Sequence, residues 1–409
     1  RYRFRFAPDQ DETDQDLRFF LDGGVSDPTD SIAMDLSLGI WWDLDGTSGP
    51  GELTTFPSPY DYGDSPVWFD LHKMYAEYRS PKLLKLARGG RQVTEYGQTF
   101  TFDGATLVLK PWGPYLEVFL FGGRTVHFFE IDQGIFEDVF VTGGVSARPI
   151  QDLRLDLDYR FAEEDTTEQE DVQDHSLALR GWFRHDDWLD VKGSLRMLNG
   201  DLAFVGGSAR FDWAKQGVGG ELSARAQLMT LRVLTEVEDP YFSILGESLP
   251  HVRFHADIWK QFVTRAGMYM FNLGFDGRQL TEDDETAFNR NFYRAYGLAT
   301  ARDFGLKGLF LSALLEWGAT GFSSDSEGDW AVGGSAGYDS GDLRAEVGTY
   351  YQQFKYDYYR DVNERANVRA VFVDLKKKVL GWLSVYGRYE FERFDRDIHT
   401  MTIGLTQKY

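Results

Sequence analysis

The sequence contains no cysteine and no apolar run long enough to cross a bilayer as a helix. Without cysteine, the chain cannot form disulfides, thiolate metal sites, a cysteine nucleophile or a covalent Cys-x-x-Cys-His haem site. A transmembrane helix needs a run of about 18 or more apolar residues, so none is encoded. Basic residues are also scarce. The 43 Lys and Arg face 65 Asp and Glu, and the net charge of −22 argues against a nucleic-acid partner.

Two-residue alternation is the main pattern that is present. In the stretch from 153 to 161, LRLDLDYRF, every second residue is apolar and every residue between is charged. A looser alternation of apolar and polar or charged residues recurs at 252–258, 343–351 and 383–391. Because successive side chains of a strand point to opposite faces, each stretch predicts a strand with one apolar and one charged face.

The connections between these stretches alternate in length. Short turns are expected near 27–31, 80–82, 110–114, 148–150, 185–187, 214–217, 260–262, 303–307, 339–342 and 376–379. Most of the longer polar connections lie between them, including the acidic run Glu163–Asp174 and the stretch Gly46–Pro66. Short turns at one end and long loops at the other are typical of bacterial outer-membrane barrels.

We therefore predict an all-β fold: a transmembrane antiparallel up-and-down β-barrel of about 20–22 strands, with short periplasmic turns and longer extracellular loops. Residues 1–409 are expected to form a single domain with no plug domain. The acidic run is then a loop outside the bilayer. A soluble propeller or sandwich is the alternative, but a propeller needs a blade repeat and sandwich strands are shorter, near five or six residues.

Two stretches resemble known barrels. The final HTMTIGLTQKY alternates and ends on an aromatic residue, and it resembles the terminal strand of Gram-negative outer-membrane barrels. Gly90-Arg91-Gln92 followed by Phe102-Asp103-Gly104-Ala105 resembles a hairpin of large porin-like and alginate-export-like barrels. The resemblance implies an outer-membrane location and a porin-like passage. Arg91 and Asp103 either face each other inside the lumen or form an ordinary cross-strand ion pair.

The charged residues of the alternating stretches are the candidate lumen lining. Both signs occur, so the sequence does not declare an ion selectivity. The candidates are Arg91, Asp103, Arg154, Asp156, Asp158, Arg160, Arg180, Arg184, Arg253, Asp257, Arg344, Glu346, Arg388 and Glu390.

Tryptophan and tyrosine cluster near predicted strand ends. Their rings are apolar and their N–H or O–H groups are polar, so they favour the headgroup level of a membrane. The expected interface anchors are Trp41, Trp42, Trp68, Trp112, Trp188, Trp213, Trp382 and Tyr409.

No enzyme or metal site is predicted. The Gly-x-Ser-x-Gly match at Gly333–Gly337 lacks the strand-to-helix turn of a nucleophile elbow. His251 and His255 would lie on one strand face about 13 Å apart, too far for one metal ion.

Two functions remain open. A lumen this wide without a plug would leak, so either the strand number is lower, the loops constrict the lumen, or a partner fills it. For the last case, the architecture resembles the barrels of porin–cytochrome conduits. That resemblance implies a periplasmic multihaem cytochrome inside the barrel and an extracellular cytochrome outside. Any haem would then belong to the partner and not to this chain. Some members carry an N-terminal cysteine pair that this sequence lacks. The alternative is a passive diffusion porin or export channel for a hydrophilic solute.

Overall fold

A computed structural model describes residues 1–9, 11–45, 66–80, 83–96, 100–126, 139–166, 169–230, 249–282, 291–320, 329–356, 364–394 and 396–408. Within them the chain forms strands of 6 to 17 residues and one short 3-10 turn, η2 (Ala214–Gln216). No helix in this part of the chain is long and apolar enough to cross a membrane. The strands are β1 (Tyr2–Ala7), β2 (Glu12–Ser26), β3 (Ile32–Asp43), β4 (Val67–Arg79), β5 (Leu84–Val93), β6 (Thr101–Leu109), β7 (Leu116–Thr125), β8 (Val139–Ile150), β9 (Leu153–Thr166), β10 (Gln169–His185), β11 (Leu189–Leu198), β12 (Asp201–Trp213), β13 (Val218–Gln227), β14 (His251–Thr264), β15 (Gly267–Leu280), β16 (Phe292–Arg302), β17 (Leu309–Thr320), β18 (Asp329–Asp339), β19 (Leu343–Tyr356), β20 (Glu364–Leu380), β21 (Leu383–Arg393) and β22 (Asp397–Gln407).

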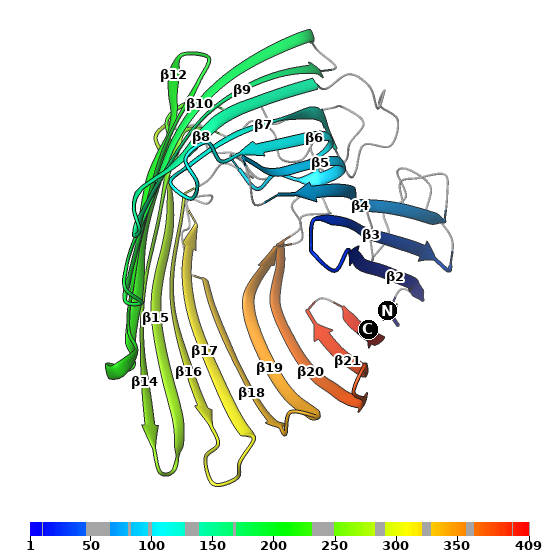
Figure 1. Ribbon diagram of the computed structural model, residues 1–409. Helices are drawn as coiled ribbons and strands as arrows, with labels where there is room; N and C mark the ends of the chain where they lie inside the picture. Colours follow the sequence, from blue (N-terminus) through cyan, green and yellow to red (C-terminus); the bar gives the residue numbers. More distant parts are fainter. Residues whose placement is uncertain are drawn as a thin grey trace.

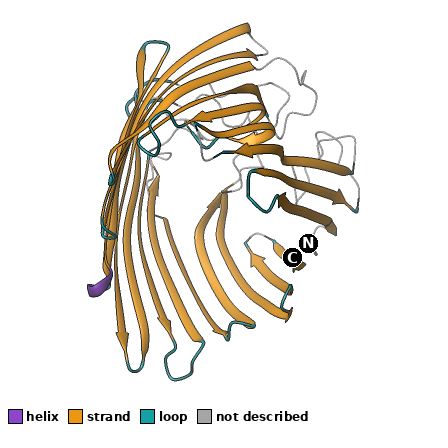
Figure 2. Cartoon of the chain, viewed as in Figure 1, coloured by secondary structure: helices purple, strands orange, loops and turns teal. Residues whose placement is uncertain are grey.

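The strands form one closed antiparallel sheet. Each strand pairs with its neighbours in sequence, and β1 pairs with β22 over Tyr2–Phe6, which closes the 22-stranded barrel. The two ends of the chain therefore lie side by side (Figure 1). Figure 2 shows the wall built almost wholly of strands, with η2 on one short connection. The predicted fold class and strand number are confirmed.

The alternating sequence explains the two surfaces of the wall. On β9, Leu155, Leu157 and Tyr159 are 40%, 44% and 47% exposed and point outward. The residues between them, Asp156 and Asp158, point inward and are only 2% and 6% exposed. Large apolar side chains open to the surroundings all along a barrel are stable only if hydrocarbon surrounds them. The chain is thus a transmembrane barrel of the outer-membrane type.

The predicted alternation of short turns and long loops is largely correct, and the errors concern the positions of strand ends. The turn expected at 260–262 lies at 265–266, and the turn expected at 376–379 lies at 381–382. Lysines in these segments look like turn residues but remain in the paired strands, with Lys260 opposite Val218 and Lys377 opposite Leu343. The turn expected at 148–150 lies at 151–152.

The acidic run Glu163–Asp174 is mostly strand and not a loop, which corrects the sequence expectation. Its backbone extends the β9–β10 hairpin, with Glu164 opposite Val172 and Thr166 opposite Gln169. The stretch 46–65, expected to be the longest loop, lies outside the described residues.

Candidate functional site: the inner wall of the barrel

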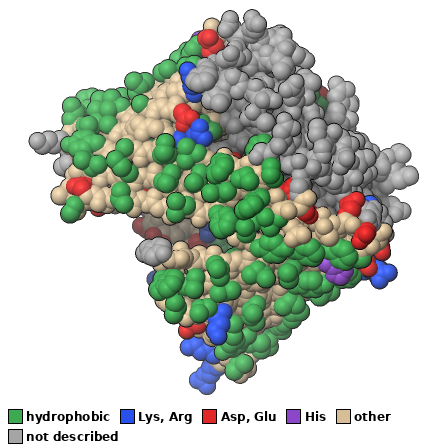
Figure 3. Space-filling view, turned by 90° about the vertical axis from the view of Figure 1, so that its right-hand side faces the viewer, with side chains coloured by type: hydrophobic (Ala, Val, Ile, Leu, Met, Phe, Trp, Pro, Cys, Tyr) green, Lys and Arg blue, Asp and Glu red, His purple; other side chains and the backbone are tan. Residues whose placement is uncertain are grey.

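The outer face carries few charges over its central band, and the inner face carries many. Figure 3 shows a broad expanse of hydrophobic side chains on the outer surface, with most charged side chains toward its margins. Twelve of the predicted lumen residues lie on inward-facing positions of their strands, opposite lipid-facing neighbours such as Leu179, Ile258, Val347 and Tyr389. The twelve are Arg154, Asp156, Asp158, Arg160, Arg180, Arg184, Arg253, Asp257, Arg344, Glu346, Arg388 and Glu390.

Most of these charges are paired along or across strands. Arg154 donates two hydrogen bonds to Asp156, at 2.9 and 2.7 Å, and Arg180 pairs with Asp158. Near the short-turn end, Arg184 lies 2.9 Å from Asp190. In each of these pairs the two opposite charges lie side by side and neutralise each other. Such pairs therefore stabilise the wall modestly and attract solute ions only weakly.

A second paired group lies on β19–β21. Arg344 contacts Glu346 at 2.8 Å, and Arg388 contacts Glu390 at 2.6 Å and Asp374 at 3.2 Å. Glu346, Asp374 and Arg388 face one another directly across the three strands. Lys376 lies directly opposite Arg344 on the same face, so the three carboxylates of this sector are balanced by three cations.

Arg91 and Asp103 form the cross-strand ion pair but do not face the lumen. Their guanidinium and carboxylate groups meet at 2.8 and 2.6 Å. Both occupy outward-facing positions. Arg91 lies two residues from Gly89, Asp103 lies four residues from Leu107, and each pair shares the outer face of its strand. Gln92, between them in the hairpin, points inward and is fully buried. The expectation of a lumen position is therefore corrected. They lie near the loop ends of β5 and β6, where the cost of charge on the outer face is lowest.

The predicted interface aromatics divide into three groups. Trp112, Trp188, Trp213 and Trp382 are 71%, 36%, 49% and 47% exposed at the short-turn end, and the rings of Trp188 and Trp213 stack at 6.3 Å. Trp42 faces outward at the loop end, as do two residues that the sequence prediction missed, Trp317 and Trp330. Trp41 and Trp68 face inward, and Tyr409 lies outside the described residues.

The inward position of Trp41 has a local cause. The guanidinium of Arg18 lies 3.8 Å from the Trp41 ring centroid, and the ring of Phe20 meets it edge-on at 5.6 Å. In the β3–β4 pairing, a register shift between Ser37 and Leu38 lies before Trp41 on β3. Two adjacent tryptophans must point to opposite faces of a strand, so only one of Trp41 and Trp42 reaches the lipid.

An apolar cluster, which was not predicted, lines the inner wall of β5–β9. Its centre is Phe102, Phe119 and Phe140, each at most 1% exposed. Tyr96 and Phe100, from the connection between β5 and β6, cover it, with ring centroids 4.5 Å from Phe119 and 4.8 Å from Phe140. The described residues of this connection that cover the cluster, Tyr96 and Phe100, therefore lie inside the barrel.

Hydrogen bonds hold Tyr96 in that inward position. The Tyr96 hydroxyl donates to Glu117 at 2.8 Å, and Lys85 donates to both Tyr96 and Glu117 at 3.1 and 2.7 Å. Tyr96 and Phe100 therefore take up space inside the barrel beside β5–β8.

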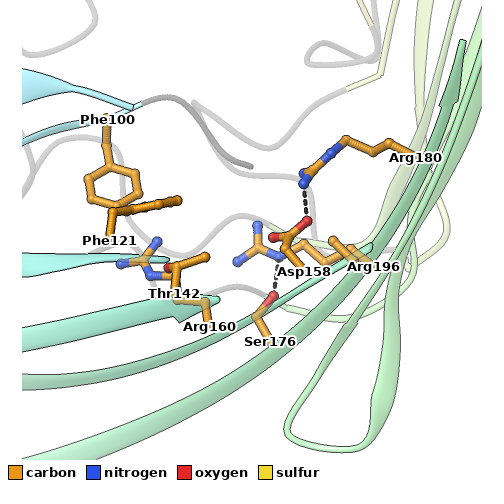
Figure 4. A pocket seen from close by; sticks show the side chains of 9 residues that line it. Phe100, Phe121, Thr142, Asp158, Arg160, Ser176, Arg180 and Arg196 are labelled. Carbon is orange, nitrogen blue, oxygen red and sulfur yellow. Dashed lines mark hydrogen bonds and ion pairs between the residues drawn. The ribbon is translucent and has the colours of Figure 1, made fainter. Parts of the chain in front are cut away.

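Beside this cover, basic side chains converge on the inner wall. Figure 4 shows Arg160, Arg180 and Arg196 around Asp158, beside the rings of Phe100 and Phe121. Arg180 pairs with Asp158, Arg196 donates to the Ser176 hydroxyl at 3.0 Å, and Arg160 lies 4.5 Å from the Phe100 ring centroid. Among the described residues that line this pocket, three are arginines and one, Asp158, is a carboxylate.

The residues tested for catalysis or metal binding have structural partners. Ser335, in the Gly-x-Ser-x-Gly match, lies inside β18, and its Oγ is 2.6 Å from Ser312 Oγ. No strand-to-helix turn surrounds it. His255 Nδ1 lies 2.5 Å from Asp276, and His251 Nδ1 lies 2.7 Å from the Leu249 carbonyl. Among the described residues, no three His, Asp or Glu side chains are grouped so that they could hold a metal ion.

Comparison with known proteins supports the fold alone. No family model matches the chain, and no curated protein does. The P pilus usher (PapC) translocation pore is similar over 100% of this chain and 98% of that one, with a TM-score of 0.55 and 9% identity. Two porins have TM-scores of 0.46. They are Pseudomonas aeruginosa OccK2 in complex with glucuronate, at 9% identity over 100% and 94% of the chains, and a BenF-like porin from Pseudomonas fluorescens Pf-5, at 11% identity over 100% and 96%.

Proposed function

We propose that the protein is a passive channel through which hydrophilic solutes cross the outer membrane. The observation that supports this most is the inner wall, where charged side chains of both signs line a closed sheet whose outer face is apolar. A wall of this kind offers water and ions a polar route, whereas the surrounding hydrocarbon excludes them. The wall contributes no chemistry to the solute, and passage follows the concentration gradient.

Planar-bilayer recording tests this proposal. The purified barrel, refolded in detergent and added without any partner, is expected to insert in discrete steps that each pass a steady ionic current. Heat-modifiable migration on a gel checks that the protein is folded before recording. Folded barrel that inserts into the bilayer and passes no current would refute a passive channel.

A partner-filled sheath is the second candidate, and the number of strands favours it. Barrels of 22 strands characteristically carry a plug, yet in the described part of this chain every element longer than three residues is a wall strand. In this version a periplasmic multihaem cytochrome occupies the lumen and passes electrons to an extracellular cytochrome. The barrel insulates and positions the haems.

The native complex distinguishes the two candidates. Barrel purified from its own cells under mild detergent conditions should show a Soret band and a second, haem-stained polypeptide if it is a sheath. Native protein without that band, which conducts after purification, supports the open channel and rejects the sheath.

A further inference from the structure

Four arginines lie together on the inner wall at the loop end of β11–β15, and we call them the arginine arc: Arg196, Arg225, Arg253 and Arg278. Arg225 is directly opposite Arg253, and Arg253 is directly opposite Arg278. Each of these three lies two residues from the loop end of its strand. Side chains directly opposite across antiparallel strands have Cβ atoms about 5 Å apart, so like charges there repel.

An aromatic ring links Arg196 to the rest. Phe204, on β12, lies between β11 and β13, and it is 8% exposed. The guanidinium groups of Arg196 and Arg225 lie 5.5 and 4.5 Å from its ring centroid. Cation–π contact orients both guanidinium groups without neutralising either charge.

For three of the four arginines, no described carboxylate forms an ion pair with the guanidinium group. Within the described part of the chain, Arg196, Arg225 and Arg253 form no salt bridge, in contrast to the paired Arg154, Arg180, Arg344 and Arg388. The carboxylates on neighbouring strands are engaged elsewhere. Asp158 pairs with Arg180, Asp174 accepts from Asn199 at 2.7 Å, and Asp276 binds His255 and Arg294.

We propose that the arginine arc is an anion-binding site at the extracellular mouth of the channel, selecting small solutes that carry phosphate or carboxylate groups. Adjacent like charges cost stability, and a bound oxyanion would offset that cost. Guanidinium groups match such oxygens with two parallel hydrogen bonds. In a chain of net charge −22, this arc is a local positive region that concentrates anions at the entrance. The inference rests on the proposed channel.

Binding is measured directly, by isothermal titration calorimetry of the full barrel in zwitterionic detergent. Inorganic phosphate is titrated in one arm and citrate in the other, to separate phosphate from carboxylate recognition. The wild-type barrel is expected to bind at least one of them, more weakly as salt is added. Because guanidinium–oxyanion bonds are charge-assisted, the Arg225→Gln, Arg253→Gln double variant should bind about tenfold more weakly or worse.

Two further variants control for folding and for net charge. Arg225→Lys with Arg253→Lys retains the charge but loses the paired guanidinium hydrogen bonds, so its binding should fall between that of the wild type and that of the glutamine variant. Lys192→Gln with Arg184→Gln removes two charges from the lumen nearer the short-turn end, and binding should change by less than about twofold. Retained heat-modifiable migration shows that each variant is folded.

The outcomes separate the arc from the channel. If the wild type binds neither anion, or if the double glutamine variant binds as tightly as the wild type, the arginine arc is not an anion site. If the barrel binds phosphate or citrate through the arc but passes no current in a bilayer, the channel proposal falls and the binding site remains. Loss of binding in the glutamine variant with retained conductance supports both.

Discussion

At the scale of single residues, burial decides which of the wall's ion pairs matter for stability. Glu77 on β4 and Arg88 on β5 lie 2.7 Å apart, and their side chains are only 3% and 6% exposed. The Tyr75 ring lies 4.3 Å from the Arg88 guanidinium. A charge that is left without its partner in such a place cannot be solvated fully, whereas one at the water-filled rim can.

Glu77→Gln should therefore destabilise the barrel by about 1–3 kcal/mol, because it removes one of the two carboxylates that accept from a buried guanidinium, the other being the more exposed Glu95 at 2.7 Å. The matched control is Arg184→Gln, which breaks a pair of similar length, 2.9 Å, whose arginine side chain is 72% exposed. That variant should stay within about 1 kcal/mol of the wild type. Reversible urea unfolding in lipid vesicles measures both. Equal losses would show that burial does not govern these pairs.

The arginine arc shows what sequence reasoning misses at this scale. Of its four members, only Arg253 was a sequence candidate, because alternation identifies the face of one strand but not its register with the next. Arg225, Arg253 and Arg278 become neighbours only through pairing across β13–β15. A usable signal does exist. Each lies two residues from a loop-side strand end, and aligning the strands at those ends would have brought the three together.

At the scale of elements, alternation predicted the strands well and their ends less well. Residues 153–161 behave as expected, because one side of β9 meets lipid and the other the lumen. Beyond the bilayer this constraint disappears, so the acidic run after Phe161 continues as a hairpin that composition alone assigned to a loop. The inner cluster around Phe102 also departs from the pattern of polar residues on the lumen face. Phe100, from the β5–β6 connection, covers the cluster, so polar residues are not needed there.

Glycines in this sector allow the strands their close approach. A Cβ built on Gly104 of β6 would lie 2.1 Å from the Gly122 carbonyl oxygen of β7, a contact that only backbone movement can relieve. Gly104→Ala should cost about 1–3 kcal/mol and slow refolding. Gly89→Ala is the control on β5, because a Cβ there meets nothing within 4 Å. Unfolding midpoints in urea compare them. Equal midpoints would contradict the close approach of β6 and β7.

At the scale of the whole molecule, the barrel as a class was predictable and its solute was not. The two-residue alternation and the alternation of short turns with long loops determine the closure of the barrel, its strand number and its two faces. The reason is that every unpaired backbone group and every charge inside the hydrocarbon is energetically costly. What passes through the lumen depends on which side chains meet across non-adjacent positions, and on connections such as the one carrying Tyr96 and Phe100. Neither is encoded in local periodicity.

The central claim is that each strand separates hydrocarbon from a wet lumen, and the absence of native cysteine makes it directly testable. Single cysteines are placed in turn at Arg344, Ala345, Glu346 and Val347 of β19, and the barrels are reconstituted into vesicles. Reactivity with a membrane-impermeant, charged maleimide is then measured. We expect fast labelling at 344 and 346 and protection at 345 and 347. Uniform labelling along the strand, or the opposite alternation, would contradict the account.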